Sequence, residues 1–260
     1  MRFQFDREHA DRPIILALTG TDVYRDLPQD PDARKSLKLA NRIIVLQPQA
    51  LRRLTFAQRK KTLVIYQSVE LRPRLKSGSV SEDAPFDVCV IGHLRYVKDP
   101  FRAAMASRLL PNSSRIRIIQ IGGAMSKQME HRARREMSIN QRYRWRGELS
   151  RARALNVLMS SRLCVISSRM EGGANTLSEA ITLAVPVLAS RIDGNVGILG
   201  KSYPGLFRVG DTRELSQLML LAENDRMFRE DLRNRIKRLA PLFHPANERR
   251  AWAELIRQIV

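Results

Sequence analysis

Short apolar runs alternate with segments of helical spacing along almost the whole chain. Three apolar runs of strand length fall in the first 70 residues: RPIILALTG (12–20), RIIVLQ (42–47) and TLVIYQS (62–68). Between them, DPDARKSLKLAN (30–41) and PQALRRLTFAQRKK (48–61) have helical patterns, and the first begins with the Asp-Pro pair typical of a helix start. Continuous apolar runs of this length indicate buried strands. The first 70 residues therefore predict about three strands of a parallel sheet.

The alternation restarts after a polar stretch at residues 71–85, LRPRLKSGSVSEDAP, which is the best candidate for a domain linker. Strand-like runs follow at FDVCVIGHL (86–94), RIRIIQIGG (115–123), YRWRGEL (143–149), RLCVISS (162–168) and PVLAS (186–190). Helical patterns separate them at residues 100–110, 126–137, 150–161 and 175–184, and the tail from Thr212 is mostly helical. Residues 86–210 thus predict about six strands, enough for a complete doubly wound domain.

We therefore expect an α/β protein with two Rossmann-like domains and a central cleft. The first, at residues 1–70, supplies too few strands for a complete domain, and the second begins at residue 86. In open parallel sheets ligands bind at the carboxyl ends of the strands, so the loops at those ends are where functional residues are expected.

The chain is strongly basic, with 46 Lys and Arg against 26 Asp and Glu and a net charge of +20. Such a surplus favours anionic partners, which include nucleic acid, phosphorylated metabolites and acidic membrane surfaces. Much of it is arginine spread along helical segments, so a solvated basic surface explains it as well. No apolar run approaches the ~20 residues of a membrane-spanning helix. The start, MRFQFDREHA, has no secretory pattern, and we expect a cytoplasmic protein.

Cys89 and Cys164 each sit inside a strand-like apolar run and are expected to be buried free thiols. Their spacing supports neither a disulfide nor a metal site. The sequence shows no His, Asp and Glu cluster with metal spacing, so no metal or other cofactor is expected.

The most informative stretch is SSRMEGGANTLSEAITLAVPVLASRIDGNVG, residues 167–197. A buried strand runs into a loop with Glu171 and paired glycines, and a helix opens near Asn175. Glycines let the backbone approach a ligand, and the unpaired N–H groups that open a helix suit a diphosphate or a sugar oxygen. Glu171 lies before the helix and Glu179 about one turn inside it, so both carboxylates can face one cleft. Acidic residues near a helix start are also common as simple dipole partners.

This segment resembles the signature of the large retaining nucleotide-sugar glycosyltransferases of the GT-B type. Their pattern is Glu-x7-Glu followed by a short apolar strand, and here it reads Glu171-GGANTLS-Glu179 and then PVLAS. The resemblance covers roughly residues 86–225. It implies that Glu171 contacts the donor sugar and Glu179 the nucleotide ribose. It also implies that the loop and helix start hold the sugar and diphosphate through Gly172, Gly173, Ala174 and Asn175.

A second part of the donor site is expected at VIGHLRYVKDP, residues 90–100. The family usually has a Gly-Arg-Leu turn here with a Lys five residues after the Arg. This chain has Gly92, then His93 in place of the Arg, followed by Arg95 and Lys98. These cations would neutralise a leaving diphosphate, with either Arg95 or His93 taking the place of the usual Arg. Together with Glu171 we take Lys98 and Arg95 as candidate catalytic residues.

A closer resemblance is to the selenosugar synthases of selenoneine biosynthesis. It rests on LTGTDVYRDL (18–27), VLQPQAL (45–51), VIYQS (64–68), IGHLRYVKDPFRAA (91–104), SSRIRIIQIGGAM (113–125), YRWRGEL (143–149) and SSRMEGGAN (167–175). It implies transfer of a sugar from UDP-N-acetylglucosamine or UDP-glucose to selenophosphate, which yields a 1-seleno sugar, with retention and without a metal.

The turn TGTD follows the first strand and is the expected acceptor site. Thr19, Gly20 and Thr21 would turn hydroxyl and N–H groups to the cleft beside Asp22, and Arg25 would add a cation for a phosphate-like anion. A Thr/Asp turn that only caps the next element explains the same residues.

The resemblance also bears on the ends of the chain. The strand, Gly-rich loop and helix with which the family begins have no counterpart here, so we expect an incomplete first domain. The last residues, 241–260, resemble a helix that leaves the second domain (86–240) and packs back on the first. We expect its Trp252, Leu255 and Ile256 stripe to serve packing.

Two other functions stay open at this point. One is a GT-B glycosyltransferase with a lipid or polysaccharide acceptor, whose basic surface makes peripheral contact with an anionic membrane. The other is a nucleic-acid-binding protein on a degenerate fold, which the charge of +20 favours. The aromatic content of 6% and the lack of a known binding motif argue against the latter.

Overall fold

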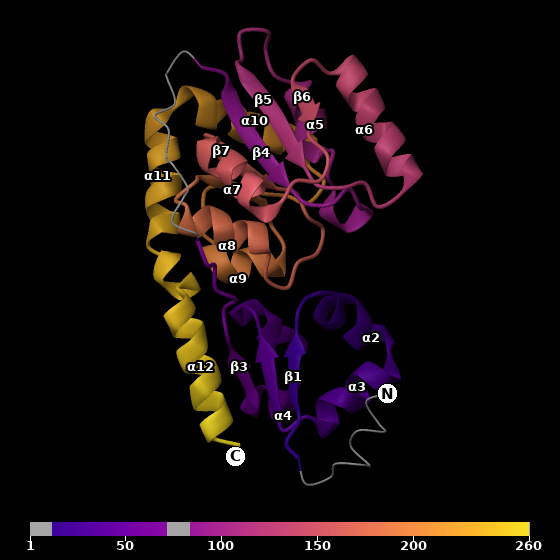
Figure 1. The fold of residues 1–260 in the computed structure, drawn as a ribbon, viewed down its shortest axis with the longest axis vertical. Helices are drawn as coiled ribbons and strands as arrows, with labels where there is room; N and C mark the ends of the chain where they lie inside the picture. Colours follow the sequence, from indigo (N-terminus) through magenta and orange to yellow (C-terminus); the bar gives the residue numbers. More distant parts are fainter. Residues whose placement is uncertain (1–11, 72–83, 260) are drawn as a thin grey trace.

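The computed structural model describes residues 12–71 and 84–259. Most of the predicted linker, residues 72–83, lies outside the described residues. The described chain forms two parallel sheets that lie one above the other in Figure 1.

The first sheet has three parallel strands in the order β1-β2-β3, namely β1 (Ile15–Leu18), β2 (Arg42–Val45) and β3 (Thr62–Val64). Leu18 pairs with Val45, which in turn pairs with Val64, so the strands end at the same level. The π-helix η1 (Asp22–Asp26) and the helices α2 (Leu27–Gln29) and α3 (Pro31–Leu39) connect β1 to β2. All three predicted strands are present.

The helix predicted over residues 48–61 is two separate pieces, the 3-10 helix η2 (Pro48–Arg53) and α4 (Phe56–Lys60). Thr55 between them has extended backbone, with φ −67° and ψ 163°. Its hydroxyl accepts from the Gln58 N–H while the Gln58 side chain accepts from the Thr55 N–H. This capping box starts a new helix and explains the break.

The second sheet has six parallel strands in the order β6-β5-β4-β7-β8-β9. They are β4 (Phe86–Ile91), β5 (Ile116–Ile121), β6 (Tyr143–Trp145), β7 (Leu163–Ile166), β8 (Val187–Ser190) and β9 (Leu206–Phe207). The strands β7 and β8 are buried at every position, as the continuous apolar runs predicted. Cys89 and Cys164 are register partners on β4 and β7, and both are buried free thiols as expected.

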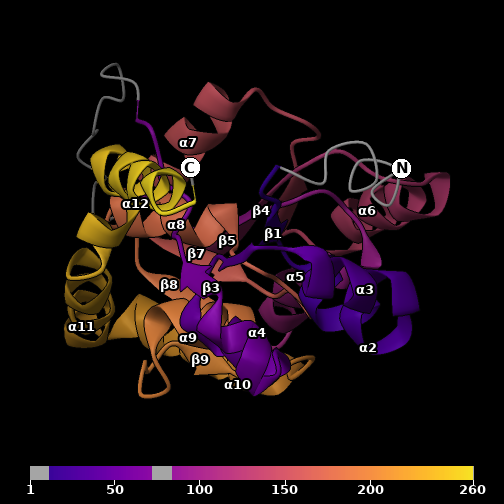
Figure 2. The ribbon, with the colours of Figure 1, turned by 90° about the horizontal axis from the view of Figure 1, so that it is seen from below.

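Helices cover both faces of this sheet (Figures 1 and 2). They are α5 (Arg102–Ser107), α6 (Lys127–Ile139), α7 (Arg151–Ser160), α8 (Asn175–Thr182), α9 (Asp193–Leu199), α10 (Thr212–Asn224) and α11 (Arg226–Lys237). Helix α9 and strand β9 are not among the elements that the sequence predicts. Helix α9 contains Gly194 and Gly197, and β9 has only two residues, so neither leaves a periodic pattern.

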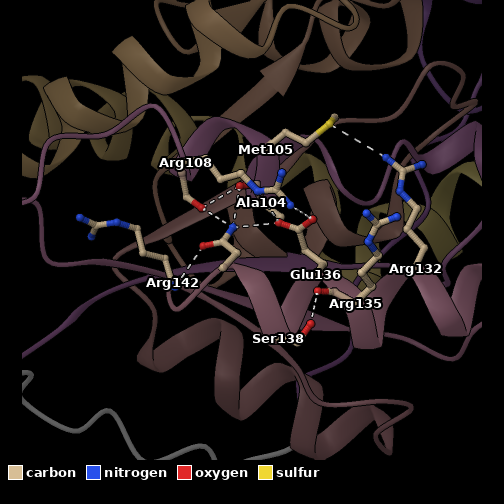
Figure 3. Close-up of polar contacts among 10 residues, drawn as sticks. Ala104, Met105, Arg108, Arg132, Arg135, Glu136, Ser138 and Arg142 are labelled. Atoms are coloured by element: carbon tan, nitrogen blue, oxygen red, sulfur yellow. Dashed lines mark hydrogen bonds and ion pairs between the residues drawn. The ribbon is translucent and has the colours of Figure 1, made fainter.

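Part of the arginine surplus is structural. Glu136 on α6 is buried, and its carboxylate accepts from the Arg108 guanidinium and from Asn140 Nδ2 at 2.9 Å (Figure 3). Asn140 Nδ2 also donates to Ala104 O at 2.9 Å and thereby joins α6 to α5. A buried carboxylate needs such partners, so these polar groups hold the two helices together rather than serve a ligand.

The last helix, α12 (Pro245–Arg257), returns from the second sheet to the first. In Figure 1 it runs beside β3, and Leu255 packs in one cluster with Ile44 and Ile65. Trp252 is partly buried against the same cluster, whereas Ile256 is 48% exposed. The predicted packing stripe is thus correct for Trp252 and Leu255 and wrong for Ile256, which lies on the outer side of the helix.

Replacing Leu255 with alanine tests this packing. Leu255 is completely buried, so Leu255→Ala should lower the free energy of unfolding by about 2–5 kcal/mol, as expected for a cavity in a core. Ile256→Ala on the same helix is the control and should have a far smaller effect. Urea denaturation measures both, and equal effects would contradict the docking of α12 on the first sheet.

Candidate functional site

A cavity of about 550 Å³ lies between the two sheets, where the carboxyl ends of β1 to β4 and β7 meet. The first domain lines it with Ala17, Thr19, Ile44, Leu46, Ile65 and Gln67, and α12 adds Glu248 and Trp252. The second domain lines it with Ile91, Gly92, His93, Arg95, Lys98, Glu171, Gly173, Asn175 and Thr176. One wall is therefore mostly apolar, and the opposite wall is polar and cationic.

The loop after β4 presents His93 and Arg95 because Leu94 between them is anchored. Leu94 is completely buried, and its N–H donates to Gly123 O at 2.9 Å. Its neighbours His93 and Arg95 on either side are exposed, and both line the cavity. An alternating extended segment thus turns two cationic or titratable side chains to the same space.

The next residues hold Lys98 in place. Asp99 adopts a left-handed backbone with φ 43°, and its carboxylate pairs with Arg102 at 2.9 Å and with Arg169 at 3.6 Å. Ser167 Oγ donates to the carbonyls of Lys98 at 3.2 Å and Asp99 at 2.9 Å. A left-handed non-glycine residue is unfavourable unless its surroundings fix it, and here they do.

Lys98 reaches the loop after β7. Its Nζ donates to Glu171 Oε1 at 2.5 Å, and Ser168 Oγ donates to the same oxygen at 2.5 Å. The Glu171 side chain is only 11% exposed. Within the part of the chain that the structure describes, no protein donor contacts Oε2. This oxygen can therefore accept hydrogen bonds from a ligand in the cavity.

Two glycines after Glu171 allow close contact between the domains. A β-carbon on Gly172 would lie 2.0 Å from Thr19 O, and one on Gly20 would lie 3.0 Å from Gly172 N. A β-carbon on Gly173 would lie 2.9 Å from the Leu46 side chain. These positions leave no room for a side chain, so the backbones of the two domains meet directly at the edge of the cavity.

Helix α8 begins after Ala174, next to this contact. Its first residues, Asn175 and Thr176, line the cavity. The first N–H groups of a helix have no partner inside it and carry a partial positive charge, so the start of α8 suits an anion or a sugar oxygen.

Glu179 lies in an adjoining cavity of about 390 Å³ that shares Gln67 and Asn175 with the larger one. Its Oε1 lies 3.3 Å from Arg151 Nε, and the side chain is 14% exposed. Burial raises the pKa of Glu179, while the Arg151 guanidinium opposes this effect. Glu171 and Glu179 therefore face two connected spaces.

The sequence matches a known protein family over most of the second domain. Residues 72–239 match the family model described as glycosyl transferases group 1. The chain belongs to this family. Comparison with curated proteins gives no match.

The fold is also similar to solved structures. HepE from Anabaena, in complex with UDP, has a TM-score of 0.79 at 16% identity, with 96% of this chain and 73% of that chain covered. An α,α-trehalose-phosphate synthase (UDP-forming) from Burkholderia vietnamiensis has a TM-score of 0.79 at 13% identity, with 97% and 71% covered. Sucrose-phosphate synthase from Thermosynechococcus elongatus has 0.68 at 21% identity, with 92% and 64% covered. The expected α/β GT-B fold is confirmed.

In this glycosyltransferase the predicted donor residues come together. Gly92, His93, Arg95, Lys98, Glu171, Gly173 and Asn175 line the main cavity, and Glu179 the adjoining one. Gly172 and Ala174 are buried directly behind this lining.

The predicted acceptor residues are more scattered. Thr19 lines the cavity, whereas Gly20 is taken up by the contact with Gly172. The Asp22 carboxylate accepts from the Thr19 N–H at 2.6 Å and so closes the turn. Thr21 is exposed, and Arg25 is exposed and pairs with Asp26 at 2.8 Å. Neither is among the residues that line the main cavity.

Several cavity residues are missed by sequence reasoning. Gln67 ends the third apolar run, and Glu248 and Trp252 lie on α12, far away along the chain. The Glu248 carboxylate accepts from the Ser68 N–H at 2.8 Å and fixes the segment that carries Gln67. Only the return of α12 brings these groups together, and local patterns hold no signal for it.

Over 12–71 and 84–259, no group of three or more His, Cys, Asp or Glu could hold a metal ion. No described helix is both long and apolar enough to cross a membrane.

The buried carboxylate of Glu179 predicts a pH-dependent cost. Since burial raises its pKa above the ordinary 4.5, the folded chain keeps the proton to higher pH than the unfolded chain. The contribution of this group to the free energy of unfolding is therefore lost as pH rises from the ordinary pKa of 4.5 through the raised pKa of Glu179. Glu179→Gln should raise the urea midpoint at about pH 7 and have little effect at about pH 4. The control is Glu130→Gln, which removes an exposed carboxylate also paired with an arginine. An equal gain at both pH values in Glu179→Gln would contradict this origin.

Proposed function

We propose that this glycosyltransferase moves a sugar from a UDP-sugar and binds the donor across the two connected cavities. The observation that carries the proposal is the placement of Glu171 and Glu179, the two ends of the Glu-x7-Glu pattern, in adjoining spaces that share Gln67 and Asn175. The similar HepE has been solved with UDP and with UDP-glucose, which supports this class of donor.

The donor follows the direction of helix α8. The ribose would lie in the smaller cavity, where Glu179 accepts from its paired hydroxyls and Arg151 gives up part of its contact. The diphosphate would lie over the start of α8, within reach of Lys98, Arg95 and His93. The hexose would then lie against the Glu171 loop, with Oε2 as acceptor for its hydroxyls.

The same groups would lower the barrier to transfer. As the bond between the sugar and the diphosphate breaks, negative charge builds up on the leaving diphosphate. Preorganised N–H groups and the Lys98 ammonium would stabilise that charge with little rearrangement. We extend the proposal to retention at the anomeric carbon and to transfer without a metal, both of which follow the resemblance, and to the cytoplasmic location expected from the sequence.

Calorimetric titration with UDP and UDP-N-acetylglucosamine tests the donor site. Glu179→Ala should weaken the binding of UDP and of UDP-sugar alike by about tenfold, as expected for lost hydrogen bonds to a charged group. Glu171→Ala should leave the affinity for UDP unchanged and remove the additional affinity that the sugar gives to UDP-N-acetylglucosamine. A folded wild-type chain that binds neither ligand would overturn the donor site, and equal losses in Glu171→Ala would refute the division between the two carboxylates.

For the acceptor we propose selenophosphate. The resemblance to selenosugar synthases supports it, as do Thr19 and the cations of the polar wall, which an oxyanion could reach. One observation favours a second candidate, an apolar glycoside or lipid. The wall formed by the first domain is largely apolar, with Ile44, Leu46 and Trp252, and Arg25 is not part of it.

Turnover with two acceptors separates these candidates. UDP release from UDP-N-acetylglucosamine should rise on addition of selenophosphate, as selenium bonds to the anomeric carbon and UDP leaves. Hydrolysis of the Se–P bond then gives a 1-seleno sugar and inorganic phosphate. Inorganic phosphate in place of selenophosphate is the control anion and should not raise UDP release. Chelation by EDTA should leave the rate unchanged. Product from an alkyl glycoside, with none from selenophosphate, would instead establish the apolar acceptor.

A further inference from the structure

We propose that Ser168, Ser190 and Asn195 are positioning residues that hold the Glu171 carboxylate toward the donor sugar. The proposal rests on the donor site described above. The three side chains form a hydrogen-bonded series that runs from helix α9 through the end of β8 to the loop after β7. None of them lines the main cavity, although Ser168 lines a small space of about 20 Å³ beside it, together with Lys98 and Glu171. They therefore act on a ligand in the main cavity through Glu171.

Ser168 is the first member of the series. It is 3% exposed, and its hydroxyl donates to Glu171 Oε1 at 2.5 Å. The other donor to this oxygen is Lys98. A bound diphosphate competes with the Glu171 carboxylate for the Lys98 ammonium, because both anions lie within reach of this side chain. Ser168 is then the donor that keeps the carboxylate oriented while Lys98 serves the leaving group.

Ser190 is the second member and fixes the backbone that carries Ser168. It ends β8 and is completely buried, and its hydroxyl donates to the Ser168 carbonyl at 2.5 Å. Asn195 Nδ2 in turn donates to Ser190 O at 2.9 Å and Ser190 Oγ at 3.2 Å. With Asn195 as donor to its oxygen, the Ser190 hydroxyl has its own proton left for Ser168.

Asn195 shows that this series is not explained by stability alone. It is completely buried, and its Oδ1 has no hydrogen-bond partner in the described chain. An unpaired buried acceptor is unfavourable, and an apolar side chain would avoid it. The amide instead supplies a donor of fixed direction to both acceptors of Ser190.

The backbone next to Asn195 provides a second contact. A β-carbon on Gly194 would lie 2.2 Å from Glu171 O and 3.1 Å from Glu171 Cβ. The start of α9 is thus packed directly on the residue that it positions. The end of β8 and the start of α9 therefore set the Glu171 loop through hydrogen bonds and through this contact.

The binding and kinetic test compares Ser168→Ala with Ser168→Thr, which keeps the hydroxyl. Ser168→Ala should leave the Kd for UDP unchanged and lower kcat with UDP-N-acetylglucosamine by about tenfold, as for one lost hydrogen bond to a charged group. Ser168→Thr should recover most of that rate. The control is Ser161→Ala, which removes a buried hydroxyl bonded to Val157 O, outside the series. A wild-type kcat in Ser168→Ala would overturn the proposal.

A double-mutant cycle on the ligand-free chain keeps the proposal testable if the donor site itself fails. Absence of UDP binding to the wild-type chain would count against the proposed function and leave this cycle valid. Urea midpoints of Ser168→Ala, Glu171→Ala and the double variant should not be additive, because Ser168 acts through Glu171. Additive shifts would overturn the positioning role. Non-additive shifts when Ser168→Ala is combined with Glu171→Ala, together with additive shifts when Ser161→Ala is combined with Glu171→Ala, would support it.

Discussion

The site depends on one carboxylate, that of Glu171, held almost out of solvent at the domain boundary. A buried carboxylate is unfavourable unless charged and hydrogen-bonding partners compensate for its lost hydration. Glu171 obtains its partners from two loops, with Lys98 after β4 and Ser168 after β7. The end of β8 and the start of α9 support the second of these loops. Because β4, β7 and β8 are neighbours in a parallel sheet, their carboxyl ends meet at one edge. The strand order is thus what makes the ion pair available.

The two walls of the cavity have different physical characters. The wall of the second domain carries His93 together with the cations Arg95 and Lys98, and these two cations suit a diphosphate. The wall of the first domain is formed mainly by apolar side chains that lie on β1 and β2 or directly after β2 and β3. The net charge of +20 therefore does not spread evenly over the site. Many of the arginines lie on helices, and some of the arginines pair with carboxylates such as that of Glu136.

The sequence predicted the parts of the fold and site that depend on local patterns. Continuous apolar runs located the strands, and the Glu-Gly-Gly stretch located the loop that holds Glu171. It could not predict Gln67, Glu248 and Trp252 as cavity residues, since their neighbours come from distant elements. The helical pattern of residues 48–61 predicts one helix. The structure has two, because the capping box of Thr55 and Gln58 starts a new helix inside this pattern. The sequence also predicts that Arg25 binds an anionic acceptor. In the structure its guanidinium pairs with the adjacent Asp26 carboxylate instead of lining the cavity.

The contact between Gly20 and Gly172 has a consequence for how such a chain can be engineered. Each glycine leaves space that the other domain's backbone occupies, so the two positions are complementary although they are 152 residues apart in the printed sequence. A chimera that joins the first domain of one relative to the second domain of another would need both glycines to close. Exchange of the first domain is therefore limited by steric fit at this point, whatever chemistry the exchanged domain brings.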